Sequence, residues 1–371
     1  MHSLPDFPWD RLAPFEHQAA AHPGGLVDLS VGTPVDPTPR VVRDALTAGS
    51  DAPGYPATYG TPELREAVAA WFARRWGIHT VDREGVLPTI GSKELVAWLP
   101  TLLGLGAGDA VVHPALAYPT YDIGARLAGA DPVASDSLTG LGPRRVGMIW
   151  VNSPANPHGA VLPVAHLAKV VAWARERGTV VASDECYLEF GWEARPASVL
   201  DPDVNGGSLD GVLAVHSMSK RSNMAGYRAG FVAGDVALVR RLLGIRKHAG
   251  MMVPAPVQGA MVAALGDDAH VDNQRKRYLA RRSMLRPALE AAGFRIDHSE
   301  GGLYLWATRN EPCWDTVAWF AALGILVAPG DFYGPGGSRH VRIALTATDE
   351  VVSAAAARLK TWHAGPSFMA R

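Results

Sequence analysis

Short apolar runs alternate with longer amphipathic segments along most of this chain, and this alternation limits its possible folds more than any other feature. The runs that we expect to form buried strands cover residues 85–90, 110–113, 147–151, 179–183 and 211–216. Strands rich in valine and separated by helices predict a mainly parallel sheet with helices on its faces. The sequence therefore predicts an α/β fold.

Capping residues predict where one of the helices begins and ends. Thr61 is a suitable cap, Pro62 suits the first turn, and Glu63 lies near the positive end of the helix dipole. Apolar side chains then follow at helical spacing as far as Gly77, which favours a stop. We expect one helix between these signals.

The pattern changes after about Gly244, which suggests a second domain in this chain of 371 residues. A loop with two prolines leads into a long polar helix around residues 272–282, and strand-like runs follow at 302–306 and 340–345. The predicted parts are an N-terminal arm (1–34) that joins the small domain, a large domain (35–245) and a smaller α+β domain (246–371).

Composition excludes several classes of protein. The net charge of −1 provides no overall attraction to nucleic acid or to a membrane surface, so an acidic substrate must be held by a few placed cations. Two cysteines form no disulfide framework, and the thirteen histidines include no ligand-spaced cluster, so we expect no metal. The amino terminus has no apolar signal core, which predicts a cytoplasmic protein.

Unusual clusters of residues follow the predicted strands of the first domain. Because open α/β sheets bind ligands beyond the carboxyl ends of their strands, we expect these clusters to meet at one site. They occupy residues 90–93, 118–121, 152–159, 183–187 and 216–230. A glycine-rich segment at 104–109 resembles a dinucleotide-binding motif, but its glycines precede a strand, so we interpret it as a turn.

The last cluster contains Lys220 among serines, directly after an apolar run. Such a lysine can be merely solvated, yet a lysine near other positive charge can be neutral enough to attack an aldehyde. Arg228 follows in the same loop and could share a phosphate with Ser217. Gly226 and Gly230 would let the backbone approach a ligand there.

Two further clusters suggest an anion site and a buried carboxylate. Gly91 and Ser92 lie between a predicted strand and a predicted helix, where free N–H groups favour an anion. The alternative interpretation is an ordinary helix cap with no ligand. Asp184 ends a β-branched run, where a carboxylate is costly unless it is paired. A protonated pyridine nitrogen is a suitable partner, whereas the alternatives are a helix cap or a surface acid.

Taken together and in order, these segments resemble a known family. The segments VNSPANPHGAV, SDECY and SMSKRSNMAGYR are similar to the signature set of fold-type I, class I/II aminotransferases. The resemblance extends from Asp28 to Ile343, nearly the whole chain. It implies the fold of a fold-type I transferase that depends on pyridoxal 5′-phosphate, with a mainly parallel central sheet and a smaller α+β C-terminal domain.

The resemblance assigns roles to individual residues. Lys220 is the catalytic residue, which carries the cofactor as a Schiff base and later moves a proton. The residues implied in cofactor binding are Tyr55, Gly91, Ser92, Lys93, Tyr118, Asn156, Asp184, Tyr187, Ser217, Lys220 and Arg228. Those implied in substrate binding are Gly32, Asn156 and Arg342.

Within that set, Asp184 pairs with the pyridine nitrogen, and Asn156 and Tyr187 bind the phenolic oxygen of the ring. Tyr118 stacks on the ring face, and Arg342 grips the substrate α-carboxylate beside Gly32, whose part is played by its backbone.

The resemblance also implies that the phosphate of the cofactor is held by Ser92, by the backbone of Lys93, by Ser217 and by Arg228. Tyr55 reaches the phosphate of the neighbouring subunit, which implies a homodimer with shared sites.

The sequence departs from the family pattern at one motif and lacks one expected residue. His158 stands where threonine is more common, and we expect its backbone to matter more than its side chain. No second arginine for a distal carboxylate is evident, and the candidates are Arg40, Arg126 and Arg246.

Four segments carry the resemblance one step further. FPWDRL, DLSVGTPVDPTP, APGYPATYGTPELREAV and SKRSNMAGYRAGF are similar to actinobacterial N-succinyldiaminopimelate aminotransferases of lysine and cell-wall biosynthesis. This implies transfer from glutamate to N-succinyl-2-amino-6-oxopimelate, the succinyldiaminopimelate transaminase reaction. The alternatives are an aminotransferase for aspartate or aromatic substrates, a β-lyase or decarboxylase with the same cofactor, and a non-catalytic regulator. A regulator of this fold would carry an additional DNA-binding domain, for which we expect too few residues before Gly32.

Overall fold

The computed structural model describes residues 4–363. Within these residues the central sheet has seven strands, in the order β2 (Val86–Ile90), β8 (Ala229–Gly234), β7 (Val212–Ser217), β6 (Val180–Asp184), β5 (Val146–Asn152), β3 (Ala110–His113) and β4 (Asp131–Ala134). Neighbours pair in parallel except for β8, which is antiparallel to β2 and β7. The predicted parallel sheet is confirmed, and the five expected runs match strands to within one residue at each end.

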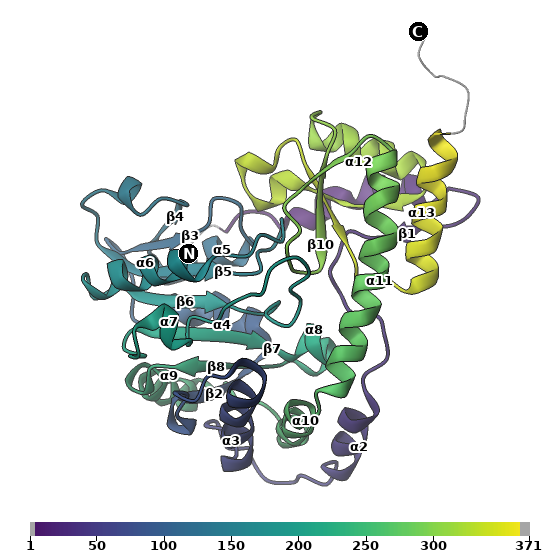
Figure 1. Cartoon of the computed structure of the whole chain (residues 1–371). Helices are drawn as coiled ribbons and strands as arrows, with labels where there is room; N and C mark the ends of the chain where they lie inside the picture. The colour runs from purple at the N-terminus through teal and green to yellow at the C-terminus, as the bar shows by residue number, and fades with distance from the viewer. Residues whose placement is uncertain (1–3, 364–371) are drawn as a thin grey trace.

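Helices cover both faces of this sheet (Figure 1). They are α2 (Arg40–Ala48), α3 (Pro62–Trp71), α4 (Gly91–Leu102), α5 (Thr120–Ala128), α6 (Val164–Arg175), α7 (Pro202–Asn205), α8 (Met218–Arg221), α9 (Val236–Ala249) and α10 (Ala255–Gly266). Consecutive strand residues point to opposite faces. Val111 and Met148 therefore pack in the core beneath α4 and α5, whereas Val112 and Ile149 pack in the core beneath α3 and α6.

The remaining elements form a smaller α+β unit beside the central sheet (Figure 1). Its antiparallel sheet has the order β12 (Ala328–Pro329), β13 (Val341–Ala344), β10 (Tyr304–Thr308) and β9 (Arg295–Asp297), and β1 (Val27–Asp28) pairs with β11 (Ile325–Leu326). Its helices are α1 (Ala13–Ala20), α11 (Ala269–Ala291), α12 (Cys313–Ala322) and α13 (Asp349–His363). Leu12 and Leu29 of the N-terminal arm pack in the same core as Phe320.

The expected boundary between the two units, at residue 245, falls inside a helix. Helix α9 continues through that position to Ala249. The buried side chains of α10, including Val257, Met261 and Leu265, pack in the core that also contains Val68 of α3. We therefore propose that the division follows α10, where the long helix α11 begins.

The helix predicted from its capping residues starts as expected. The Thr61 side chain accepts a hydrogen bond from the backbone N–H of Leu64 at 3.2 Å, and Pro62 occupies the first turn. After Trp71 the helix continues as a π-helical turn, and Gly77 ends it with a φ of 71°. That left-handed conformation is the one that glycine adopts without strain.

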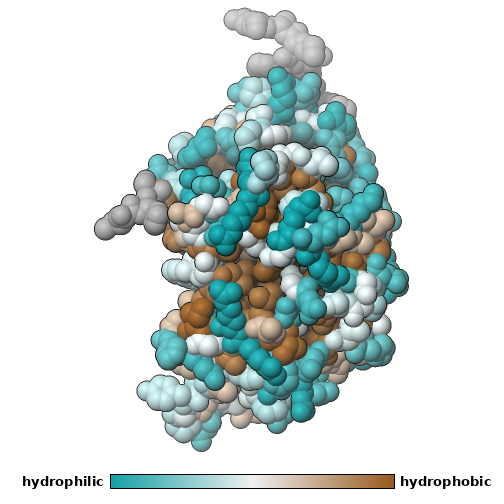
Figure 2. Space-filling view, turned by 90° about the vertical axis from the view of Figure 1, so that its left-hand side faces the viewer, coloured by the Kyte–Doolittle hydropathy of each residue, from teal (hydrophilic) through white to brown (hydrophobic). Residues whose placement is uncertain are grey.

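Figure 2 shows the face of the molecule on the left-hand side of Figure 1, where apolar side chains gather near the middle between hydrophilic ones.

A cavity of 310 Å³ at the amino-terminal ends of β5 and β6 is lined by Leu105, Val180 and Leu238. Of the helices within residues 4–363, none is both long and apolar enough to cross a membrane. Asp184 and Ser217, two of the predicted site residues, lie at the opposite, carboxyl ends of β6 and β7.

Candidate active site

The carboxyl ends of β5 and β6 place Asn156 next to Asp184. Asn152 and Asp184 end these two neighbouring strands and are register partners. The side-chain amide of Asn152 donates to the Asp184 backbone carbonyl at 2.9 Å, and its oxygen accepts from the Asn156 backbone N–H at 2.8 Å. Two residues predicted to bind opposite parts of one ligand are thus held by one asparagine.

Asp184 is buried and accepts two hydrogen bonds. The Tyr121 hydroxyl donates to one carboxylate oxygen at 2.8 Å, and the backbone N–H of Cys186 donates to the other at 3.1 Å. Burial raises the pKa of Asp184, while the bonds from Cys186 and Tyr121 oppose that rise. A buried carboxylate of this kind needs a positive partner, and a protonated pyridine nitrogen fits that need.

Lys220 lies on the short helix α8 that follows β7. Ser217 caps this helix, because its hydroxyl oxygen accepts from the Ser219 backbone N–H at 3.1 Å. The Lys220 amine donates to the backbone carbonyl of Gly32 at 2.5 Å. Burial lowers the pKa of Lys220, which favours the neutral, nucleophilic amine that attack on an aldehyde requires.

Two glycines allow the start of α4 to approach Arg228. Gly91 has a φ of 70°, and a Cβ atom at this position would overlap the Arg228 guanidinium. A Cβ atom at Gly230 would lie 3.0 Å from the Ser92 backbone nitrogen. The first N–H groups of a helix lack intrahelical partners, so their convergence with a guanidinium forms a cradle that fits a phosphate.

Arg342 lies in β13 and is almost fully buried. It donates to the Asn156 side-chain oxygen at 3.0 Å and to the Ser30 backbone carbonyl at 2.8 Å. Among the described residues, its Nε has no hydrogen-bond partner. Because the Asn156 oxygen is bound to Arg342, its amide nitrogen remains to donate to a ligand, and the buried guanidinium suits a carboxylate.

A pair of tyrosines completes the centre of the site. The hydroxyl groups of Tyr187 and Tyr304 lie 3.0 Å apart, and burial raises the pKa of Tyr187. The ring of Tyr304 also lies against Arg342, whose guanidinium carbon is 4.0 Å from the ring centroid. Gly32 is needed beside this ring, because a Cβ atom there would overlap the Tyr304 hydroxyl.

Three predicted residues lie at the edges of this arrangement. Tyr118 is packed edge-on against Tyr121, with ring centroids 5.9 Å apart, and burial raises its pKa to about 12. Lys93 is exposed, and its amine lies 5.9 Å from the Phe7 ring centroid. Tyr55 is 96% exposed on a loop, so its own chain does not bring it to the site.

The three arginines considered for a distal carboxylate are each engaged elsewhere. Arg246 is fully buried and binds both carboxylate oxygens of Glu94, at 2.8 and 2.9 Å. The other two form ion pairs one helical turn away on the protein surface, Arg40 with Asp44 and Arg126 with Asp122. Arg246 is therefore not available as that hypothesis required.

His158 has a local role that its side chain performs. Its Nδ1 accepts from the Ala160 backbone N–H at 3.2 Å, and its ring centroid lies 4.9 Å from that of His298. Burial, together with His298, lowers the pKa of His158 to about 4. We expected its backbone to matter more than its side chain; the structure shows that the neutral imidazole also takes part in the turn.

Sequence reasoning missed Tyr121 and Tyr304, which contact Asp184 and Tyr187 through their hydroxyl groups. Tyr121 stands three residues after Tyr118 and so belongs to a strand-end cluster, which was the available signal. Tyr304 lies in a strand of the smaller sheet, and no sequence pattern connects it to Tyr187.

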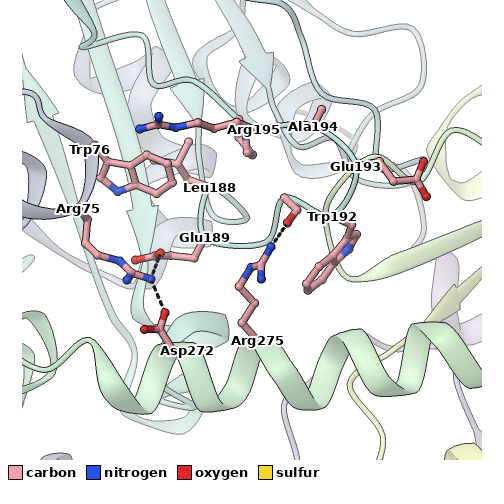
Figure 3. A pocket seen from close by; sticks show the side chains of 12 residues that line it. Arg75, Trp76, Leu188, Glu189, Trp192, Glu193, Ala194, Arg195, Asp272 and Arg275 are labelled. Atoms are coloured by element: carbon pink, nitrogen blue, oxygen red, sulfur yellow. Dashed lines mark hydrogen bonds and ion pairs between the residues drawn. The ribbon is translucent and has the colours of Figure 1, made fainter.

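A hollow of 580 Å³ lies outside this constellation, between α11 and the segment 188–196 (Figure 3). The Arg75 guanidinium bridges Glu189 at 3.0 Å and Asp272 at 2.9 Å, and Arg275 donates to the Gly191 carbonyl. In the described part of the chain it is lined by none of the predicted site residues.

Comparisons with known proteins agree with this geometry. The family model for aminotransferases of class I and II matches residues 25–359. The chain is 64% identical to 4-dedimethylamino-4-oxo-anhydrotetracycline transaminase OxyQ of Streptomyces rimosus over 359 residues, covering 97% of this chain and 100% of that protein. It is 64% identical to the probable aminotransferase Rv1178 of Mycobacterium tuberculosis over 357 residues, covering 96% and 85% respectively.

A solved structure is similar over nearly the same extent. It is that of a probable N-succinyldiaminopimelate aminotransferase from Thermus thermophilus, with a TM-score of 0.86 and 27% identity, covering 96% of this chain and 100% of that one. Enzymes of this family use pyridoxal 5′-phosphate, and the buried Asp184 and the cradle at Gly91 and Arg228 fit that cofactor. The chain therefore belongs to the class I and II aminotransferases and takes pyridoxal 5′-phosphate as its cofactor.

Proposed function

We propose that this aminotransferase carries its cofactor on Lys220 and transfers the amino group of glutamate to N-succinyl-2-amino-6-oxopimelate. The observation that carries the first part is the position of the part-buried Lys220 amine, which contacts Gly32 in the same constellation as Arg342. Bound pyridoxal phosphate supplies an electron-withdrawing ring that stabilises negative charge on the substrate α-carbon.

Each of the other residues of the site has a distinct role in binding the substrate or the cofactor, or in moving a proton. Arg342 holds the substrate α-carboxylate, which fixes the α-carbon near Lys220. Once the amino group of the substrate has displaced it from the cofactor, the freed Lys220 amine would take the proton from that carbon and return it to a carbon of the cofactor. Asp184 keeps the ring nitrogen protonated, while Asn156 and Tyr187 donate to the phenolic oxygen of the ring.

The phosphate and the subunit interface form one further part of this proposal. Ser92, Ser217, Arg228 and the Lys93 backbone surround the phosphate. Tyr55 completes the same cradle in a neighbouring subunit, which makes the enzyme a homodimer with shared sites. The exposure of Tyr55 within its own chain supports this assignment, since a large aromatic residue that is 96% exposed has a surface left for a partner.

We assign the distal carboxylate of the acceptor to Lys93. Its amine lies 5.9 Å from Phe7, which stacks on Trp9 at 5.6 Å, and Trp9 contacts Tyr333 at 6.4 Å. Tyr333 in turn lies 4.9 Å from the guanidinium of Arg342. These contacts connect Lys93 with Arg342 and support a cation at the far edge of the site, where the exposed Lys93 side chain is open to a ligand.

A second acceptor class is supported by the similarity to OxyQ, which is named for a transaminase reaction on an oxo-anhydrotetracycline. Aromatic side chains gather beside Arg342, where Tyr304 and Tyr333 contact its guanidinium and Trp9 contacts Tyr333. A polycyclic aromatic ketone would pack against such a wall. Glutamate as donor would still require Arg342 for its α-carboxylate.

The deciding experiment compares kcat/KM for three acceptors with glutamate as donor: the succinylated keto acid, the same acid esterified at its succinyl carboxylate, and an aromatic keto acid. Lys93→Gln should lower kcat/KM for the free acid by about tenfold or more and leave the ester unchanged. Lys169→Gln, at an exposed lysine of α6, is the matched control. Preference of the wild-type enzyme for the aromatic acceptor would replace the succinylated substrate with the second class.

A further inference from the structure

Tyr304 touches the principal groups on both sides of the site. Its hydroxyl lies 3.0 Å from that of Tyr187, on the cofactor side. The face of its ring lies 4.0 Å from the Arg342 guanidinium carbon, on the substrate side. The same side chain fills the space next to Gly32, whose carbonyl accepts from Lys220.

The two tyrosines come from different units of the fold. Tyr187 follows β6 of the central sheet, whereas Tyr304 begins β10 of the smaller sheet. The backbone N–H of Gly302 donates to the Phe190 carbonyl at 2.8 Å, which holds the two segments in register. Both rings are buried in one cluster with Phe190, so the hydroxyl groups meet in a region of low dielectric constant.

The chemistry of the hydroxyl group determines the direction of this hydrogen bond. Each tyrosine hydroxyl has one proton to donate. If Tyr187 donates its proton to the phenolic oxygen of the cofactor, then the bond between the tyrosines must be donated by Tyr304. Such a chain polarises Tyr187 and makes it a stronger donor, because hydrogen bonds in series strengthen one another.

Other titratable and charged groups surround Tyr187 and Tyr304, and a substitution that removes only the Tyr304 hydroxyl leaves all of them in the protein. They are Tyr118, Cys186, Lys220, Tyr278, Tyr333 and Arg342. Within the described residues, the Tyr187 hydroxyl is hydrogen-bonded to Tyr304 alone. Removal of the Tyr304 hydroxyl therefore isolates one interaction.

We propose that Tyr304 is a positioning residue whose hydroxyl, acting through Tyr187, sets the pH at which the Lys220-linked cofactor changes its visible absorption. This inference rests on the cofactor roles of Lys220 and Tyr187 proposed above. A hydrogen bond to the phenolic oxygen stabilises its anion and so lowers the pH at which the linked nitrogen loses its proton. Weakening that bond raises the midpoint.

The test is a spectroscopic pH titration of the purified holoenzyme without substrate. Tyr304→Phe keeps the ring and removes the hydroxyl, and it should raise the midpoint by roughly 0.2–0.6 pH unit. Tyr187→Phe should raise it by roughly 1–2 pH units. Tyr278→Phe alters a tyrosine of the same cluster that does not bond to Tyr187, and it should leave the midpoint in place.

The decisive comparison is a double-mutant cycle. In the Tyr187→Phe background, Tyr304→Phe should add no further shift. An unchanged midpoint in Tyr304→Phe alone, or the same shift with and without Tyr187, overturns the inference while the cofactor roles stand. A wild-type enzyme whose visible absorption does not titrate, or persists as a protein-bound imine in Lys220→Ala, overturns both this inference and the proposed attachment.

Discussion

Replacement of Tyr121 by phenylalanine tests how the protein maintains the charge on Asp184. The substitution keeps the aromatic ring, which stacks on Trp150 with centroids 5.0 Å apart, and removes only the hydroxyl that donates to Asp184 at 2.8 Å. Both groups are buried, so water cannot replace the lost bond. The change is therefore confined to one hydrogen bond on the carboxylate.

The structure allows the size and the sign of the effect to be worked out. A hydrogen bond to a charged group contributes about 1.5–3 kcal/mol, which corresponds to roughly one to two pKa units. Burial already raises the pKa of Asp184 above its ordinary value. The loss of this hydrogen bond raises that pKa further. If the carboxylate supports charge on the cofactor ring in the transition state, kcat/KM should fall roughly 10- to 100-fold.

The assay combines pH-dependent kinetics with urea unfolding of the apoenzyme. A raised folded-state pKa means that the ionised Asp184 destabilises the fold, so the variant should lose stability at neutral pH and recover it as pH falls through the raised pKa. Tyr59→Phe is a matched control, because its hydroxyl donates to the Glu84 carbonyl at 2.7 Å, away from the site. A Tyr121→Phe enzyme that loses stability but retains full kcat/KM would refute the catalytic part of this reasoning.

Three further predictions concern the anchor lysine, the shared site and His158. Lys220→Ala should abolish transamination and the visible absorption of the protein-bound imine, and spectra of the mutant with added cofactor check both. Mixing inactive Tyr55→Ala and Lys220→Ala proteins should restore activity through hybrid dimers with one complete site; no gain after demonstrated subunit exchange would contradict a shared site. Because burial lowers the pKa of His158 to about 4 from an ordinary 6.5, its neutral form contributes stability that is complete above pH 6.5 and is lost as pH falls toward 4. Between pH 7 and pH 4, the free energy of unfolding measured in urea should fall by about 3 kcal/mol less in His158→Gln than in the wild type.

Local patterns predicted much of this fold because the relevant forces act over a few residues. The strand that ends at Asp184 was located to within one residue, since a β-branched run between helical segments has few other solutions. The start of α3 was recognised because Thr61 and Pro62 act on backbone groups within one turn. The order of the motifs likewise placed Lys220 and Asn156 at strand ends, where a parallel sheet brings its ligand-binding residues together.

Tertiary structure decided what depends on contacts between distant segments. Arg246 was a candidate for a substrate carboxylate until the fold paired it with Glu94 from 152 positions earlier in the chain. Helix α10 packs against α2 and α3, which only a completed core can determine.

By itself, the sequence determined the α/β class, the family resemblance and the chain order of Lys220, Asp184 and Arg342. Only the tertiary structure decided that Tyr304 of the smaller sheet meets Tyr187 of the larger one and that Arg342 shares Asn156 with the cofactor side. The physical reason is that hydrogen bonds and packing depend on positions in space. Residues 117 and 186 positions apart become neighbours only when both sheets have formed.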